Sequence, residues 1–104
     1  SSNTSGLSCA ALAESLDPAR RARFCVTHFF NPPRYLKLME LVAAPDTDPG
    51  VLAALGAFLE RRMGKGVVVA KDTPNFIANR VGIYAFMRAA ASRHFVTRSN
   101  FRAL

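Results

Sequence analysis

A chain of 104 residues, half of them hydrophobic, is long enough for one small domain with a buried core. It has no apolar run near the ~18 residues that a membrane-spanning helix needs, and its start, Ser1–Gly6, lacks the basic and apolar regions of a signal peptide. Cys9 and Cys25 follow no metal-binding or redox spacing. We therefore expect both to pack as small apolar side chains in a reducing cytoplasm.

The net charge of +7 is concentrated in the last quarter of the chain. Up to Asn79 the sequence has nine Lys and Arg residues against seven Asp and Glu residues, and from Arg80 to Leu104 it has five Arg residues and no acid. Such a basic end is typical of segments that contact nucleic acid or a membrane surface. The simpler interpretation, which we prefer, is that its acidic partners lie in a segment outside this chain.

The first elements in chain order are two short helices. Ser2–Leu7 has the composition of a polar turn after a preceding strand, and Ser8–Leu16 predicts a helix. Asp17 followed by Pro18 predicts a further helical turn, with a capping side chain and proline at the first helical position.

Two strands are predicted next. Phe24–Phe30 is aromatic and β-branched, Lys37–Ala43 predicts a second strand, and the proline-containing Asn31–Arg34 segment separates them. Because this connection is too short for a parallel crossover, we expect the two strands to be antiparallel.

A longer helix and a third strand follow. Thr47-Asp48-Pro49 is a helix start, apolar residues continue at helical spacing to Met63, and Gly64 predicts the helix end. Gly66–Ala70 predicts the third strand.

The last predicted element is a helix capped by Asp72-Thr73-Pro74 that extends to about Ala91. Its expected apolar face consists of Phe76, Ile77, Val81, Tyr84 and Ala85. Strands that alternate with helices in this order indicate an open α/β sheet.

His28 and Glu40 are the first candidates for chemistry. His28 ends its strand, where ligands gather in open α/β sheets, and an imidazole can take and return a proton near neutral pH. Glu40 lies between Leu38 and Val42 on one face of the next strand, where a carboxylate is costly without a partner. A hairpin-like turn would bring Glu40 beside His28. The alternatives are a structural histidine and an edge-strand glutamate that faces water.

Three polar residues allow both structural and functional interpretations. Asn31 precedes a proline and could simply form the turn. Asn79 falls within an apolar-faced helix, where asparagine has poor propensity, which indicates either a buried structural hydrogen bond or a functional amide. Ser5 could act as a helix N-cap.

Four motifs occur in a fixed order: Ser2–Ser5 (SNTS), Thr27–Pro33 (THFFNPP), Lys37–Glu40 (KLME) and Lys71–Arg80 (KDTPNFIANR). Together they resemble the 3-hydroxyacyl-CoA dehydrogenase family over roughly residues 1–87. The resemblance implies the distal half of a Rossmann-like NAD-binding domain at 1–73, without its first βαβ unit. It also implies that 74–104 begins an all-helical domain, the part through which the full-length enzyme forms a homodimer.

The resemblance also implies roles for the candidate residues in oxidising 3-hydroxyacyl-CoA to 3-ketoacyl-CoA with NAD. His28 would be the general base, and Glu40 would pair with it. Ser5 would contact both substrate and nicotinamide. Asn31 would lie near the nicotinamide, and Asn79 would help to hold the substrate.

The sequence departs from the family at two places. It contains no Gly-x-Gly-x-x-Gly phosphate loop, since Gly64-Lys65-Gly66 is a helix end followed by a strand. Beyond about Met87 it no longer resembles the helical domain of the family. An internal fragment, a truncated product or a shifted reading frame would each explain this difference. We expect the isolated chain to be inactive. The alternatives are a superfamily dehydrogenase that acts on a free hydroxy acid and a non-catalytic basic binding module.

Overall fold

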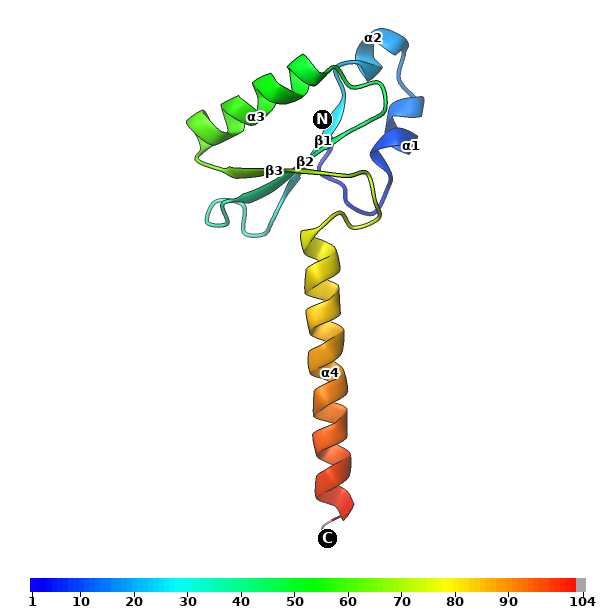
Figure 1. Cartoon of the computed structure of the whole chain (residues 1–104), viewed down its shortest axis with the longest axis vertical. Helices are drawn as coiled ribbons and strands as arrows, with labels where there is room; N and C mark the ends of the chain where they lie inside the picture. The colour runs from blue at the N-terminus through cyan, green and yellow to red at the C-terminus, as the bar shows by residue number, and fades with distance from the viewer. Residues whose placement is uncertain (103–104) are drawn as a thin grey trace.

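The computed structural model describes the backbone of residues 1–102 and the side chains of residues 1–92. A small α/β body precedes one long helix that extends away from it (Figure 1), and the molecule measures 68 × 30 × 17 Å. The elements are α1 (Cys9–Glu14), α2 (Pro18–Arg21), β1 (Cys25–Phe29), β2 (Leu38–Ala43), α3 (Pro49–Met63), β3 (Gly66–Ala70) and α4 (Ala78–Arg102).

The three strands form one sheet in the order β1-β2-β3. β1 and β2 are antiparallel, as their short connection predicts, and β2 and β3 are parallel, with α3 as the crossover between them. β2 is therefore the central strand, so Glu40 does not lie on a sheet edge. The mixed α/β class expected from the sequence is confirmed.

The N-terminal segment runs beside the outer edge of β1. Ser2 forms an isolated parallel bridge with Val26, in which the Ser2 N–H donates to the Cys25 carbonyl at 3.3 Å and the Thr27 N–H donates to the Ser2 carbonyl at 2.8 Å. This pairing fixes the segment that carries Ser5 against the strand that carries His28.

Helices lie on both faces of the sheet. Leu41 points toward Gly56 of α3 on one face. On the other face a buried cluster joins α1, the sheet and the segment before α4, and consists of Cys9, Ala13, Val26, Val42, Ala44, Ala70 and Phe76. Cys9 and Cys25 are free and buried, as expected. Burial, and secondarily the nearby Asp72 carboxylate, raises the pKa of the Cys9 thiol to about 11.

Local signals place most helix ends correctly. Asp17 and Asp48 cap α2 and α3 with proline at the start of each helix, and Ser8 accepts the Ala11 N–H at the start of α1. Gly64 ends α3 in the left-handed conformation with φ 64°. Ser8, and not Ser5, is therefore the N-cap of the first helix.

The prediction that Asp72 caps the last helix is wrong. The Asp72 carboxylate instead accepts hydrogen bonds at the start of α1, from the N–H groups of Cys9 (2.7 Å) and Ala10 (2.9 Å) and from the Ser8 hydroxyl (2.7 Å). Asn75 and Phe76 have φ of 63° and 49°, so a right-handed helix cannot run through them from the Asp72-Thr73-Pro74 segment.

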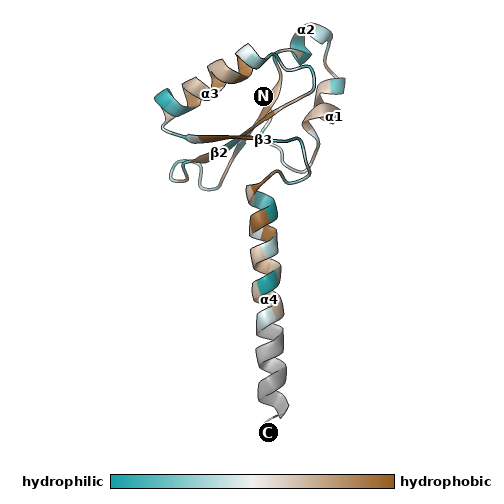
Figure 2. Cartoon of the chain, viewed as in Figure 1, coloured by the Kyte–Doolittle hydropathy of each residue, from teal (hydrophilic) through white to brown (hydrophobic). Residues whose placement is uncertain are grey.

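α4 accordingly begins at Ala78, and it continues to Arg102 rather than ending near Ala91. Phe76 precedes the helix and is buried, so it does not belong to the exposed apolar side of α4. Exposed apolar residues occur in the half of α4 nearer the sheet, where brown and teal segments alternate (Figure 2), and Val81, Tyr84, Phe86 and Met87 are all more than 60% exposed. Among the described residues no helix is both long and apolar enough to cross a membrane.

Asp72→Asn should lower the free energy of unfolding by about 1–2 kcal/mol, because the amide NH2 group cannot accept the hydrogen bonds that one carboxylate oxygen takes from Ser8 and Ala10. Burial acts to raise the pKa of Asp72, but the hydrogen bonds from Ser8, Ala10 and Cys9 outweigh it and lower that pKa. The carboxylate therefore stabilises the fold at neutral pH, and this contribution is lost as the pH falls through the lowered pKa.

Urea unfolding at neutral and acidic pH measures this difference. Asp46→Asn is the matched control, because Asp46 is exposed and caps no helix. Equal stability of the Asp72 and Asp46 variants at neutral pH would contradict the assignment.

Candidate active site

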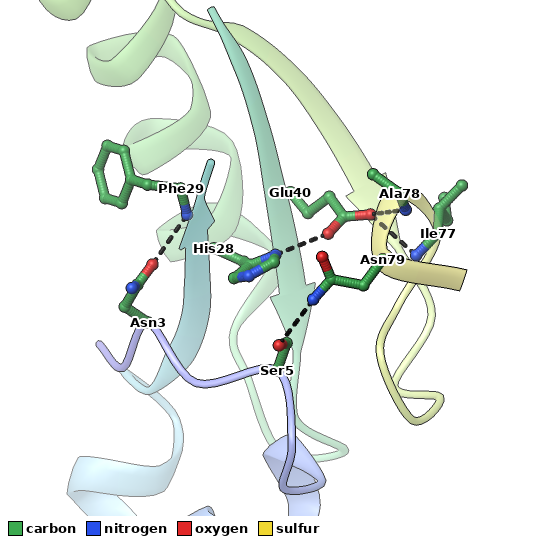
Figure 3. A network of polar contacts seen from close by, with 8 residues as sticks. All are labelled: Asn3, Ser5, His28, Phe29, Glu40, Ile77, Ala78 and Asn79. Carbon is green, nitrogen blue, oxygen red and sulfur yellow. Dashed lines mark hydrogen bonds and ion pairs between the residues drawn. The ribbon is translucent and has the colours of Figure 1, made fainter. Parts of the chain in front are cut away.

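His28 and Glu40 form a buried pair across the β1–β2 ladder. The register places the two residues directly opposite each other, and His28 Nδ1 lies 2.9 Å from Glu40 Oε2 (Figure 3). His28 is 8% exposed and Glu40 is 1% exposed. The expected pairing is therefore confirmed, and the alternative of a water-facing glutamate is excluded.

The β1–β2 connection is held by a lysine that lies between α3 and β3. Lys65 Nζ donates to the carbonyl groups of Pro33 and Leu36, the latter at 2.8 Å, and lies 5.6 Å from the centre of the Phe29 ring. These contacts close the loop directly after His28 and help to fix the strand register that sets Glu40 opposite it.

The second oxygen of Glu40 is bound by the start of α4. Oε1 accepts the N–H groups of Ile77 at 2.8 Å and Ala78 at 2.9 Å (Figure 3). An anion is stabilised at a helix N-terminus, where backbone N–H groups are otherwise unpaired. The carboxylate thus has three hydrogen-bond partners, although it lies on the central strand among apolar neighbours.

These contacts favour one tautomer of the imidazole. Oε1 accepts hydrogen bonds from two N–H groups, and Oε2 faces Nδ1 of the ring. This arrangement suits an ionised carboxylate that accepts a hydrogen bond from Nδ1–H. Neutral His28 then has its Nε2 lone pair available. Phe30 and Phe76 contact the ring edge-on, with centroids 4.7 Å and 5.6 Å away. The arrangement suits a general base at Nε2.

A second polar pair lies beside the first. Asn79 Nδ2 donates to Ser5 Oγ at 2.9 Å, and the Asn75 N–H donates to the Ser5 carbonyl at 3.1 Å. Asn3 Oδ1 accepts the Phe29 N–H at 2.8 Å, which ties the same N-terminal segment to the residue after His28 (Figure 3). Segments that lie 74 positions apart in the sequence thereby meet beside the histidine.

Four of the five candidates are therefore assembled into two hydrogen-bonded pairs. Asn31 is exposed after the end of β1, and its side chain hydrogen-bonds to none of the described residues. The sequence reasoning did not identify the N–H groups of Ile77 and Ala78 as partners of Glu40. No residue type signals such a role, because the donors belong to the backbone.

Comparison with known proteins gives consistent matches. The family model "3-hydroxyacyl-CoA dehydrogenase, NAD binding domain" matches residues 1–73. A Bacillus subtilis protein named "Probable 3-hydroxyacyl-CoA dehydrogenase" is 55% identical over 87 residues, which are 84% of this chain and 11% of that protein.

Two solved structures share the fold. FadB2 of M. tuberculosis superposes with a TM-score of 0.80 at 30% identity, over 86% of this chain and 30% of FadB2. An NAD+-dependent 5-formyl-3-hydroxy-2-methylpyridine 4-carboxylic acid 5-dehydrogenase gives a TM-score of 0.72 at 33% identity, over 86% of this chain and 28% of that protein.

This chain thus spans less than a third of the length of each of these relatives. The family model nevertheless matches more than half of this chain and covers both strands of the His28–Glu40 pair. The chain belongs to the family of NAD-binding domains of 3-hydroxyacyl-CoA dehydrogenases.

Proposed function

We propose that the protein to which this chain belongs oxidises 3-hydroxyacyl-CoA to 3-ketoacyl-CoA with NAD, in fatty acid oxidation or 3-hydroxybutyryl-CoA metabolism. The observation that carries the proposal is the buried His28–Glu40 pair, whose geometry leaves Nε2 as a proton acceptor. Family membership supports the choice of substrate and cofactor.

In this proposal His28 Nε2 takes the proton of the substrate hydroxyl group. Glu40 holds the ring through Nδ1 and stabilises the imidazolium that forms. The Ser5 hydroxyl and the Asn79 amide position the reacting oxygen, whose charge changes during the reaction.

NAD supplies the hydride acceptor when it is bound. The half-buried Ser5 hydroxyl and the exposed Asn31 amide, which follows the end of β1, are neutral polar groups, and such groups suit the carboxamide of the nicotinamide. The residues present therefore fit the nicotinamide end of the cofactor.

A dehydrogenase of the same superfamily that acts on a free hydroxy acid is the second candidate. The name of one structural relative describes an NAD+-dependent dehydrogenase of a pyridine carboxylic acid, so the fold carries chemistry without coenzyme A. The His28–Glu40 pair would serve either substrate equally, because it acts on a hydroxyl group.

We further propose that residues 1–73 are the distal part of a Rossmann-like domain and that residues 74–104 begin a helical domain of a cytoplasmic homodimer. The parallel bridge of Ser2 beside β1 supports a larger sheet. Exposed apolar residues on α4, and a groove of about 760 Å³ lined by Val69, Ile77 and Tyr84 among others, support a further layer over this surface. The side chains of Arg93, Arg98 and Arg102, which belong to the basic end, lie outside the described residues.

His28→Gln in the full-length protein should reduce kcat by ~10²–10⁴-fold, because glutamine cannot take a proton. Following NADH formation with 3-hydroxybutyryl-CoA measures this. His94→Gln is the matched control at the other histidine of the chain and should retain activity. Near-normal turnover of His28→Gln would refute His28 as the base.

The two candidate substrates are distinguished by measuring kcat/KM for a 3-hydroxyacyl-CoA and for the corresponding free hydroxy acid under the same conditions. The proposal expects kcat/KM to favour the CoA thioester. Preference for the free acid would replace it with the second candidate, while leaving the role of His28 intact.

The isolated 104-residue chain should neither bind NADH at micromolar concentration nor turn over substrate. The pyrophosphate of a dinucleotide binds to a glycine-rich loop at a helix N-terminus, and this sequence has no such motif. Calorimetric titration with NADH and an oxidation assay on the same sample test this expectation. Micromolar affinity together with measurable turnover would contradict it.

A further inference from the structure

The first turn of α4 contacts both polar pairs of the site. Ile77 and Ala78 donate their backbone N–H groups to Glu40 Oε1, and the adjacent Asn79 donates its side-chain amide to Ser5 Oγ (Figure 3). Three consecutive residues thus bind the partner of the histidine and the neighbouring serine.

The backbone before this turn is fixed by independent contacts. Asn75 and Phe76 are both left-handed, a conformation that costs free energy in residues other than glycine and persists where the surroundings enforce it. The Asn75 N–H bonds to the Ser5 carbonyl, and Phe76 is 1% exposed with its ring edge-on to His28. The direction in which the Ile77 and Ala78 N–H groups point is therefore set by packing around the site itself.

Two N–H donors on one carboxylate oxygen restrict rotation of the Glu40 side chain. With Oε1 held, Oε2 stays directed at Nδ1 of His28. A neutral imidazole beside a fixed acceptor keeps its proton on the nitrogen that faces the acceptor. A free neutral histidine has no such constraint and exchanges between its two tautomers.

We propose that residues 77–79, the start of α4 together with the residue before it, are the positioning element of the His28–Glu40 pair. It fixes Glu40, and through Glu40 it selects the Nδ1–H tautomer of His28, which leaves Nε2 as the proton acceptor. The consequence for turnover rests on the proposed function, whereas the tautomer itself can be measured without cofactor or substrate.

Ala78→Pro removes one of the two donors while leaving a residue that a helix accepts at its first position. Imidazole ¹⁵N spectra of the 104-residue chain, recorded above neutral pH in a His94→Gln background, report the His28 tautomer alone. The parent should show the Nδ1–H form, and Ala78→Pro should shift the population toward Nε2–H. Ala78→Gly, which keeps the N–H group and weakens the helix, should match the parent.

Amide exchange provides the reciprocal measurement, and it decides the matter if Ala78→Pro does not fold. Glu40→Ala should accelerate exchange of the Ile77 and Ala78 amides at least tenfold relative to the parent. The Val81 amide, which bonds to the Ile77 carbonyl, should change less.

The proposal would be overturned by an unchanged tautomer in folded Ala78→Pro, by an equal shift in Ala78→Gly, or by unaltered exchange at both amides. Loss of the Nδ1–H form without loss of activity in the full-length protein would instead count against the proposed function.

Discussion

The carboxylate of Glu40 lies on the central strand of a three-stranded sheet, where burial of a charged group costs several kcal/mol unless hydrogen bonds compensate it. The compensation comes from a side chain on β1 and from two backbone groups at the start of α4. The strand register, the left-handed turn at Asn75–Phe76 and the point at which α4 begins are all consistent with this one requirement.

Other polar contacts bring distant segments together around the same site. The N-terminal segment is tied to β1 through Ser2 and Asn3, and to α4 through Ser5. Asp72, just after β3, binds the start of α1 and so holds that helix against the sheet. Each polar contact of the site therefore also stabilises the tertiary fold, and a catalytic role and a structural role of the same residue are not alternatives.

Sequence patterns predicted the features whose causes are local. Asp17 and Asp48 each cap a helix that starts with the next residue, a proline, and the short connection at 31–36 implied an antiparallel pair that brings Glu40 to His28. For Ser5 and Asn79 the residues alone left structural and functional interpretations open, and the motifs of the family supplied the expected roles.

The features that escaped prediction depend on residues far apart in the sequence. Asp72 resembles an N-cap for the following helix, yet its partners lie 62 to 64 positions earlier, so a correct local pattern gave the wrong helix. A left-handed Phe76 has no sequence signal, since its conformation is imposed by the core it enters. The backbone N–H groups that donate to Glu40 depend on that turn, so the sequence did not indicate them either.

The position of the first turn of α4 also bears on how such proteins could be recombined. The match to the family model ends at residue 73 of this chain. That boundary suggests a crossover point for exchanging nucleotide-binding modules between relatives. A chimera joined there would take residues 77–79 from the other parent, and with them the donors to Glu40 and the partner of Ser5. A crossover placed after Asn79 keeps every described contact of the site within one parental sequence, so the unit that must be inherited intact is longer than the segment that the family model matches.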